Sequence, residues 1–542
     1  MKVVYDTAAM QVSERGVKDL FWPLTRSEQN TVRDTLLSGL VRVARARSDN
    51  SDVDRDLFSA MLQLVLREAL NLIYIHTVAR RARTAGHEVV WPSRCRHCES
   101  VGASRAPLPE ESALIQTLSR GPSCHSSWRR YPVRLRRDLI YNGFGWNAFR
   151  PRKIARDIVA CHSTDVLEEH ARSVPYTVKY TLFGEWFTSL DERSSEVQSA
   201  EPLSASIVDE AVDVLRGALL SIGESLPDAL AGYLRDCIIR GSRLSRVHIE
   251  RILARPDRVP RRLWTGTGAY IWARFLRHAV RRLGGTVTGH EHGTGESVIR
   301  YFNTKTFSDL ESADEFVTFN SNQRRWLEET IDERFLVPLK RPTIGVPPYR
   351  AGLVRYAGRP LSGSRDTRRP KDAPLRVMYV GPIYGGFSTR ISGHNSDVLL
   401  IDWQARLFAK LREWNFEVLF KPHPEGDQRP PPAFVKDLGV KELSGPFEDE
   451  WHKADVYLFD WKSTTAFSTA MSTGLPLVLV DFSFEIFAPE MQSLVDSNCG
   501  RVEGWADEVN RLHVDWTKLR YALEHPPAGH ADVVRETAFR FA

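Results

Sequence analysis

The chain has 542 residues, of which 42% are apolar, and its 74 Lys and Arg nearly balance its 68 Asp and Glu. This length predicts two or three domains, and the composition excludes an intrinsically disordered chain. The near balance of charge argues against a nucleic-acid-binding protein, in which basic residues are concentrated on one face.

The N-terminal residues MKVVYDTAAM contain no apolar core of signal-peptide length. No window of the sequence approaches the roughly 18–20 apolar residues that span a membrane. We therefore expect a cytoplasmic protein.

Basic residues are concentrated between residues 129 and 153. Two interpretations stay open: a solvated face, or a site for an anionic partner such as an acidic glycan, a lipid phosphate or the inner face of the membrane. In the second interpretation, the acceptor side of a site and a peripheral membrane contact use Arg129, Arg130 and Arg134.

The first 240 residues have a mainly helical pattern. Apolar residues recur at helical spacing over 57–83, and a short strand is expected over 88–91. Further helices are expected over 205–222 and 227–253. The residues from about 92 to 255 are interpreted as a helical and Arg-rich insertion on the first domain.

Cysteine residues leave two alternatives open. Cys95, Cys98, Cys124 and Cys161 could bind zinc, but their spacing matches no standard zinc finger. The other alternative is a set of free thiols in a reducing compartment.

From residue 261 the pattern changes to alternating strands and helices. Strands are expected over 262–265, 286–289 and 315–319, with a helix over 270–283 and another that begins after Asn320 or Ser321. After a break rich in Pro and Gly, the alternation resumes, with strands over 375–380, 416–421, 455–459 and 476–480 and helices over 398–414 and 465–473. Such alternation predicts parallel sheets covered by helices.

These elements predict an α/β, GT-B-like fold. In it, two Rossmann-like parallel-sheet domains face a cleft, and the first carries a large helical N-terminal elaboration. The expected boundaries are 1–345 for the N-terminal acceptor-side domain, 346–374 for a linker, 375–505 for the nucleotide-donor domain and 506–542 for C-terminal helices.

Three loops of the second half follow predicted strands, where parallel sheets bind ligands. The first is the Gly-rich loop 381–386, which suggests that Gly385 and Gly386 approach a phosphate. The second, Lys-Pro-His-Pro-Glu over 421–425, fixes His423 between two prolines. The third precedes a helix, so its hydroxyl groups cap that helix and, with its dipole, favour an anion; the candidates are Lys462, Ser463, Thr464 and Thr465.

In the first half, the sequence His-Glu-His-Gly-Thr-Gly-Glu over 290–296 follows a strand. Its imidazole and carboxylate groups can supply a general base for an acceptor hydroxyl. The candidates are His292, Glu291 and Glu296. Two His at i and i+2 without a third ligand give only weak support for a metal.

Together these motifs resemble a GT-B family: the CDP-glycerol glycerophosphotransferases with the related capsule Kdo transferases and polysialyltransferases. Residues 292–294 are similar to the family's His-Gly-Thr element, and residues 421–424 to its Lys/Arg-Pro-His-Pro element. Residues 460–464 resemble its Asp-Tyr-Ser-Ser element, with Trp461 for Tyr, an additional Lys462, and Thr464 for the second Ser.

This resemblance covers residues 260–300 and 375–485, whereas the first 240 residues match no known pattern. It implies a metal-independent enzyme of cell-envelope polysaccharide synthesis, in the cytosol or peripheral to the membrane. It also implies that His423, Ser463 and Thr464, with Lys421, hold the phosphates of the donor and that His292 acts near the reacting centre.

The expected function is therefore a glycosyltransferase or polyol-phosphate transferase. It moves a group from a nucleotide-sugar or similar nucleotide-activated donor to a glycan or lipid-linked acceptor, such as a capsule precursor, without a cofactor. Two alternatives stay open: a nucleotide-sugar epimerase on the same fold, and a non-catalytic protein of polysaccharide assembly.

Overall fold

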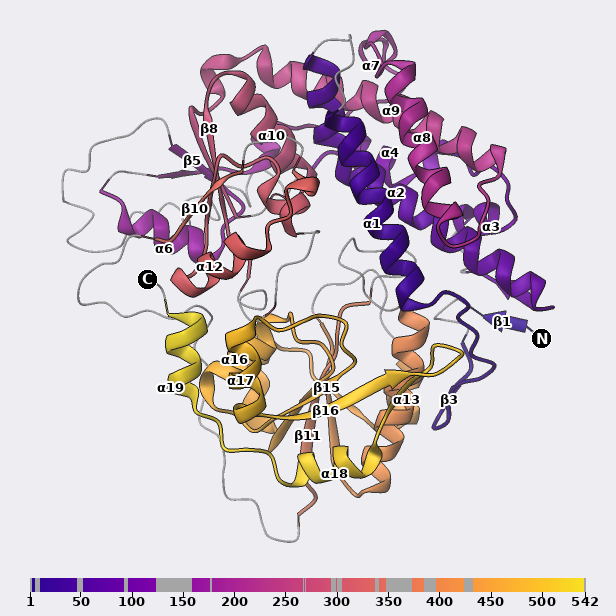
Figure 1. The fold of residues 1–542 in the computed structure, drawn as a ribbon, viewed down its shortest axis with the longest axis vertical. Coiled ribbons are helices and arrows are strands. Elements are labelled where there is room, and N and C mark those ends of the chain that lie inside the picture. Colours follow the sequence, from indigo (N-terminus) through magenta and orange to yellow (C-terminus); the bar gives the residue numbers. More distant parts are fainter. Residues whose placement is uncertain are drawn as a thin grey trace.

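The computed structural model describes residues 2–4, 10–45, 52–91, 96–122, 158–175, 178–266, 268, 270–293, 299, 305–336, 341–347, 373–384, 396–423 and 432–540. Two large, mainly parallel sheets are built from different halves of the described chain and are surrounded by helices (Figure 1). The α/β class with two parallel sheets, predicted from the alternation of strands and helices, is confirmed.

The first sheet has the strand order β10-β9-β8-β7-β5-β6, and all its neighbouring strands run parallel. Its strands are short and largely buried, as expected for a sheet covered on both faces. Their bounds are β5 Ile158–Cys161, β6 Lys179–Tyr180, β7 Arg262–Thr265, β8 Thr286–His290, β9 Glu315–Val317 and β10 Thr343–Gly345.

Strands β5 and β6 lie within the stretch that the sequence pattern assigns to an insertion. Strand β5 has only four residues, too few to show a period. It forms because it pairs with β7, where Val159 lies opposite Leu263. The first sheet therefore begins about a hundred residues earlier than the alternation of strands and helices suggests.

A layer of helices lies beside the first sheet (Figure 1). Helix α1 packs on α2 and α8, and α2 packs on α9 and α10. Helix α10 in turn contacts β7 and β8. The helices of this half are α1 Arg26–Arg45, α2 Asp52–Thr84, α3 Arg96–Gly102, α4 Ala113–Arg120, α6 Asp165–Ser173, α7 Ser195–Ser199, α8 Ala205–Leu220, α9 Asp228–Leu253, α10 Ile271–Arg282 and α12 Ser321–Thr330.

Helix α2 corrects one expectation. Its stretch Asp56–Thr84 is long and apolar enough, by length and composition, to cross a membrane, and no other helix among the described residues is. Most of this stretch is buried, and the helix packs against α1, α9 and α10. A helix enclosed by other helices is apolar around its whole circumference, which accounts for this composition.

The second sheet has the order β13-β12-β11-β14-β15-β16-β17, and only the last pair is antiparallel. Its central strands are continuous apolar runs, typical of strands buried on both faces. The bounds are β11 Arg376–Val380, β12 Glu417–Lys421, β13 Lys441–Glu442, β14 Val456–Phe459, β15 Leu477–Asp481, β16 Cys499–Ala506 and β17 Leu512–Val514.

The helices of the second half are α13 Asp397–Glu413, α14 Pro432–Asp437, α15 Phe447–Glu450, α16 Thr465–Thr473, α17 Pro489–Asn498, α18 Trp516–Glu524 and α19 Ala531–Val534. Helix α16 begins and ends at the predicted residues. Only helices are expected over 506–542, but this segment includes strand β17, which pairs with the end of β16. The second sheet thus extends further along the chain than predicted.

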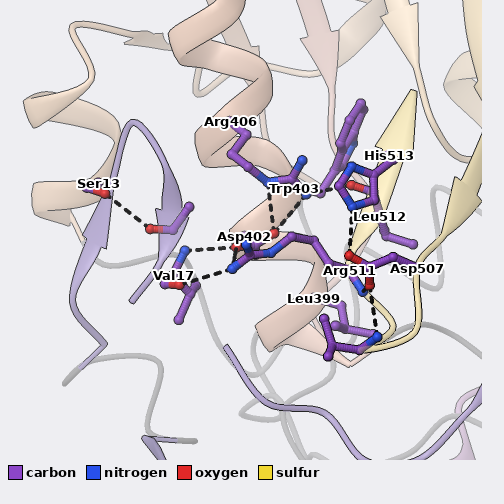
Figure 2. Close-up of polar contacts among 12 residues, drawn as sticks. Ser13, Val17, Leu399, Asp402, Trp403, Arg406, Asp507, Arg511, Leu512 and His513 are labelled. Atoms are coloured by element: carbon purple, nitrogen blue, oxygen red, sulfur yellow. Dashed lines mark hydrogen bonds and ion pairs between the residues drawn. The ribbon is translucent and has the colours of Figure 1, made fainter. Parts of the chain in front are cut away.

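The N-terminal hairpin, β2 Val12–Ser13 and β3 Gly16–Val17, crosses to the second half and packs on α13. Figure 2 shows its contact with the buried carboxylate of Asp402. Asp402 accepts a hydrogen bond from the Val17 amide at 2.9 Å, and it pairs with Arg406 at 2.8 Å and Arg511 at 3.3 Å. One buried carboxylate therefore joins the hairpin to the second half.

The C-terminal segment makes the opposite crossing (Figure 1). The side-chain amides of Asn320 and Asn322, at the start of α12, donate hydrogen bonds to the carbonyl groups of Ala538 and Thr537, each at 2.9 Å. Each end of the described chain thus contacts the other half of the molecule.

Candidate active site

The carboxyl ends of β5, β7 and β8 lie at one edge of the first sheet. Thr265 at the end of β7 is opposite both Cys161 of β5 and Gly289 of β8. The turns after β5 and β7 are joined by a hydrogen bond of 3.0 Å from the Gly266 amide to the His162 carbonyl. The residues that follow these strands therefore share one surface, as expected for parallel strands.

Two imidazoles, those of His290 and His170, form hydrogen bonds at this edge. Nδ1 of His290 lies 3.2 Å from the Thr265 carbonyl, and Nε2 of His290 lies 2.9 Å from Nδ1 of His170. Because a carbonyl only accepts, Nδ1 of His290 carries the proton, and Nε2 accepts from His170. Burial lowers the pKa of His170 to about 4 and that of His290 well below its usual range, so both rings are neutral near pH 7.

His292 is exposed, whereas the adjacent Glu291 is buried. The Glu291 carboxylate accepts the His292 amide at 2.9 Å and the Lys305 ammonium at 2.6 Å. Lys305 also pairs with Asp309 at 3.0 Å, and Asp309 accepts the Gly268 amide at 2.7 Å. This network joins the loop after β8 to the turn after β7.

One buried ammonium, that of Lys305, pairs with two carboxylates in this network. Burial opposes ionisation of Asp309, but the Lys305 ammonium and the Gly268 amide hold the pKa of Asp309 below its usual range. Since Glu291 is engaged by Lys305 and by its own neighbour's amide, its position suits holding the loop better than taking a proton. The structure describes two of the predicted base candidates, His292 and Glu291. Of these two, His292 has the exposed side chain.

In the second half, three strands also end together. Val380 of β11 is opposite Lys421 of β12 and Phe459 of β14. Lys421 is buried, with its ammonium 2.7 Å from the Pro422 carbonyl. His423 follows and is half-buried. The residues after β12, which include His423, and the loop from β14 to helix α16 therefore leave the same edge of the sheet.

Helix α16 begins at this edge. Thr464 is its N-cap, and the Thr464 hydroxyl accepts the Phe467 amide at 3.0 Å. The capping predicted for this stretch is confirmed at Thr464. Ser463 is half-buried and Thr465 is exposed, and both residues lie beside the positive end of the helix dipole.

Lys462, which precedes these residues, is engaged by a carboxylate. Its ammonium contacts both carboxylate oxygens of Asp481, at 2.9 and 3.0 Å, and lies 4.3 Å from the centre of the Phe487 ring. The side chain is buried, and burial lowers its pKa. Its position indicates an ion pair within the sheet edge, and its predicted contact with a donor phosphate stays a prediction.

The candidate residues of the two halves meet at α16. A methyl group added at Gly293, next to His292, would lie 3.7 Å from the hydroxyl oxygen of Thr465. Nearby, Ile299 forms an isolated antiparallel bridge with Phe487. The loop that carries His292 in the first half is thus brought close to the anion-favouring helix start of the second half.

Sequence reasoning missed several residues at this site. His162, after β5, lies with its ring 5.6 Å from that of His292, and the buried Lys305 sets the loop. Asp460 is the first residue of the motif at 460–464, but the sequence alone suggested no role for it. It is buried, and its carboxylate accepts hydrogen bonds from Tyr379 at 2.6 Å and Trp403 at 2.9 Å. Its buried neighbours could not be deduced from local spacing.

Other predicted site residues, Glu296, Gly385, Gly386, Arg129, Arg130 and Arg134, lie outside the described residues. So do Cys95 and Cys124 of the predicted thiol set. Cys98 is disulfide-bonded, so the free thiol expected there is wrong, whereas Cys161 is a buried free thiol. In the part of the chain that the structure describes, no three His, Cys, Asp or Glu residues gather as metal ligands.

No protein-family model matches the chain, and no curated protein sequence is significantly similar to it. Seven chains of solved structures align with it, among them the following two. The lipopolysaccharide outer core galactosyltransferase WaaB, in its apo form, has 12% sequence identity and a TM-score of 0.34, over 70% of this chain and 94% of that one. Phytolacca americana UGT2, complexed with UDP-2fluoro-glucose and pterostilbene, has 11% identity and a TM-score of 0.31, over 70% of this chain and 93% of that one. At these values the likeness alone identifies no function.

Proposed function

We propose that this protein is a glycosyltransferase, or a polyol-phosphate transferase of GT-B type, that moves a group from a nucleotide-activated donor to a surface polysaccharide or its precursor. The proposal includes a cytoplasmic location with contact to the inner membrane face. The supporting motifs are the His-Gly-Thr, Lys-Pro-His-Pro and Asp-to-Thr elements over 292–294, 421–424 and 460–464.

The observation that carries the proposal is the proximity of Gly293 to Thr465, whose hydroxyl oxygen lies 3.7 Å from the position that a Cβ on Gly293 would take. It joins the loop of an exposed imidazole, His292, to a helix N-terminus that carries hydroxyl groups. A helix N-terminus stabilises an anion, and an imidazole accepts or donates a proton near neutral pH. A group-transfer reaction with a phosphate leaving group needs both functions side by side.

The mechanism follows from this geometry. The diphosphate of the donor lies at the start of α16, where Ser463 and Thr465 donate hydrogen bonds. The acceptor oxygen forms a bond to the transferred group while the bond from that group to the leaving phosphate oxygen breaks. The nucleotide leaves with the electron pair, and the helix start offsets its developing charge. The acceptor's proton goes to a ring nitrogen of His292.

Residues after β12 complete the proposed donor site. His423 leaves the same sheet edge as α16, so an imidazole N–H there donates to a donor phosphate. The buried ammonium of Lys421 contributes positive charge near that edge without pointing into solvent. Lys462 has a structural role in this account, because Asp481 holds its ammonium.

Nucleotide binding is tested by thermal unfolding of the full chain with CMP, CDP, UDP and GDP. A nucleoside diphosphate is expected to raise the unfolding temperature, and Ser463→Ala to reduce that rise. Ser221→Ala is the control, since this exposed Ser is the C-cap of helix α8, far along the chain from the residues of the proposed site. A chain that no nucleotide stabilises would favour the non-catalytic alternative.

Turnover is tested with His292→Ala and the nucleotide that stabilises the protein best. Loss of a general base lowers the rate by about 10²–10⁴-fold, while nucleotide stabilisation stays as in the wild type. The control is His525→Ala, an exposed His after α18. Retained turnover in His292→Ala would reject the base role, and conversion of a UDP-sugar to its epimer without transfer would favour the epimerase.

A further inference from the structure

A row of aromatic rings leads away from His292 along the edge of the first sheet. The His162 ring lies 5.6 Å from that of His292, the Tyr270 ring 6.2 Å from that of His162, and the Phe183 ring 5.4 Å from that of Tyr270. Successive rings are tilted by only 31°, 34° and 44°. Each ring therefore neighbours the next in one connected aromatic row.

Four separate segments build this row, and His292 belongs to the one after β8. His162 follows β5, Tyr270 precedes α10, and Phe183 begins a short 3-10 helix after β6. Phe183 is buried and anchors the far end, whereas the Tyr270 side chain is 38% exposed. His162 is held in the left-handed backbone region at φ 54°, an uncommon conformation for a residue other than Gly. The fold thus holds an accessible aromatic ring two rings away from the proposed base.

We propose that Tyr270 and His162 form the binding subsite for a sugar ring of the acceptor. A pyranose has an apolar C–H face and a rim of hydroxyl groups. The exposed ring of Tyr270 can cover the apolar face, and the imidazoles of His162 and His292 can hydrogen-bond to the rim. This subsite rests on the proposed function, since the first half then holds the acceptor while the nucleotide occupies the second.

The position of the row favours a sugar of the acceptor over the base of the nucleotide. The donor phosphates are assigned to α16 of the second half, whereas all four rings belong to the first half. A sugar on Tyr270 would lie two ring contacts from His292. A nucleobase on Tyr270 would instead place the donor across the side from which the acceptor must approach.

The test is saturation-transfer NMR on the full chain with methyl glycosides of a hexose, an N-acetylhexosamine and a uronic acid. At least one glycoside is expected to receive saturation on its C–H protons from the aromatic residues. Tyr270→Ala should reduce that signal about fivefold, and Tyr270→Phe should preserve it, because the ring face and not the hydroxyl makes the contact. Tyr521→Ala is the control: Tyr521 is 65% exposed and also has a His ring beside it, but lies on α18.

Several outcomes would overturn the subsite. They are the absence of any glycoside signal, an unchanged signal in Tyr270→Ala, or an equal loss in Tyr521→Ala. Uridine, cytidine and guanosine are measured in parallel, and a Tyr270-dependent signal from a nucleoside in place of a glycoside would assign the ring to the donor base. Glycoside binding without any nucleotide stabilisation would support the subsite while rejecting the transferase; nucleotide stabilisation without glycoside binding would reject the subsite alone.

Discussion

At the scale of single residues, buried charge pairs determine which polar groups are available to a ligand. Glu291 and Lys462 both belong to predicted site motifs, but Lys305 holds the first and Asp481 the second. Breaking such a pair by removing one partner leaves an uncompensated buried charge, which is costly. The neighbours His292, Ser463 and Thr465 are partly or fully exposed. The same motifs therefore contain both supporting residues and the residues proposed to act.

Asp460 is a buried carboxyl whose proton depends on pH. Burial raises its pKa to about 6, although Tyr379 and Trp403 donate to it. Between about pH 4 and pH 6, the folded state holds a proton that the unfolded state has lost. Stability from this group is therefore complete below about pH 4 and is lost as pH rises through about 6, by on the order of 3 kcal/mol.

The variant Asp460→Asn removes this titration. We expect the free energy of unfolding of the wild type, measured by urea denaturation, to fall relative to that of Asp460→Asn between pH 4 and pH 7. The difference between the two free energies of unfolding cancels the contributions of groups that titrate equally in both proteins. A difference that stays constant over this range would show that Asp460 is charged throughout.

At the scale of elements, the N-terminal hairpin depends on one close backbone approach. Gly16 has φ +94°, and a methyl group there would collide with the carboxylate of Asp402 on α13. The hairpin presents the adjacent Val17 amide to that same carboxylate (Figure 2). Only a residue without a side chain permits this contact.

Gly16→Ala is therefore expected to destabilise the protein through both backbone strain and the collision with Asp402. Gly86→Ala is a matched control, because Gly86 also has a positive φ, of +78°, but has open space around it. We expect Gly16→Ala to lower the free energy of unfolding by at least about 1 kcal/mol more than Gly86→Ala does. Equal effects in chemical denaturation would mean that the hairpin does not depend on Asp402.

At the scale of the whole molecule, apolar clusters extend across both halves. One cluster combines Val317, Phe319 and Trp326 of the first half with Phe467 and Phe487 of the second. The two terminal segments add polar contacts in opposite directions. Each half therefore loses part of its own core when the other unfolds.

We accordingly expect the full chain to unfold in one cooperative transition. In differential scanning calorimetry, the calorimetric and van't Hoff enthalpies should agree, and a stabilising nucleotide should shift the whole transition. Two resolved transitions, of which the nucleotide moves only one, would contradict a shared core.

The sequence by itself determined the elements that depend on near neighbours. Apolar periodicity located α8, α9 and α13 to within two residues, and the Ser and Thr residues before α16 located its start, because helix periodicity and capping act within a few residues. The order of strand-end motifs also indicated which loops would gather at a sheet edge, since parallel strands end together.

Only the tertiary structure decided which distant groups meet. The four residues of β5 become a strand through pairing with β7, a hundred residues away. Lys462 is directed to Asp481, and the row from His292 to Tyr270 joins three segments that are separate in sequence. Such contacts depend on how whole elements pack, which local spacing does not encode.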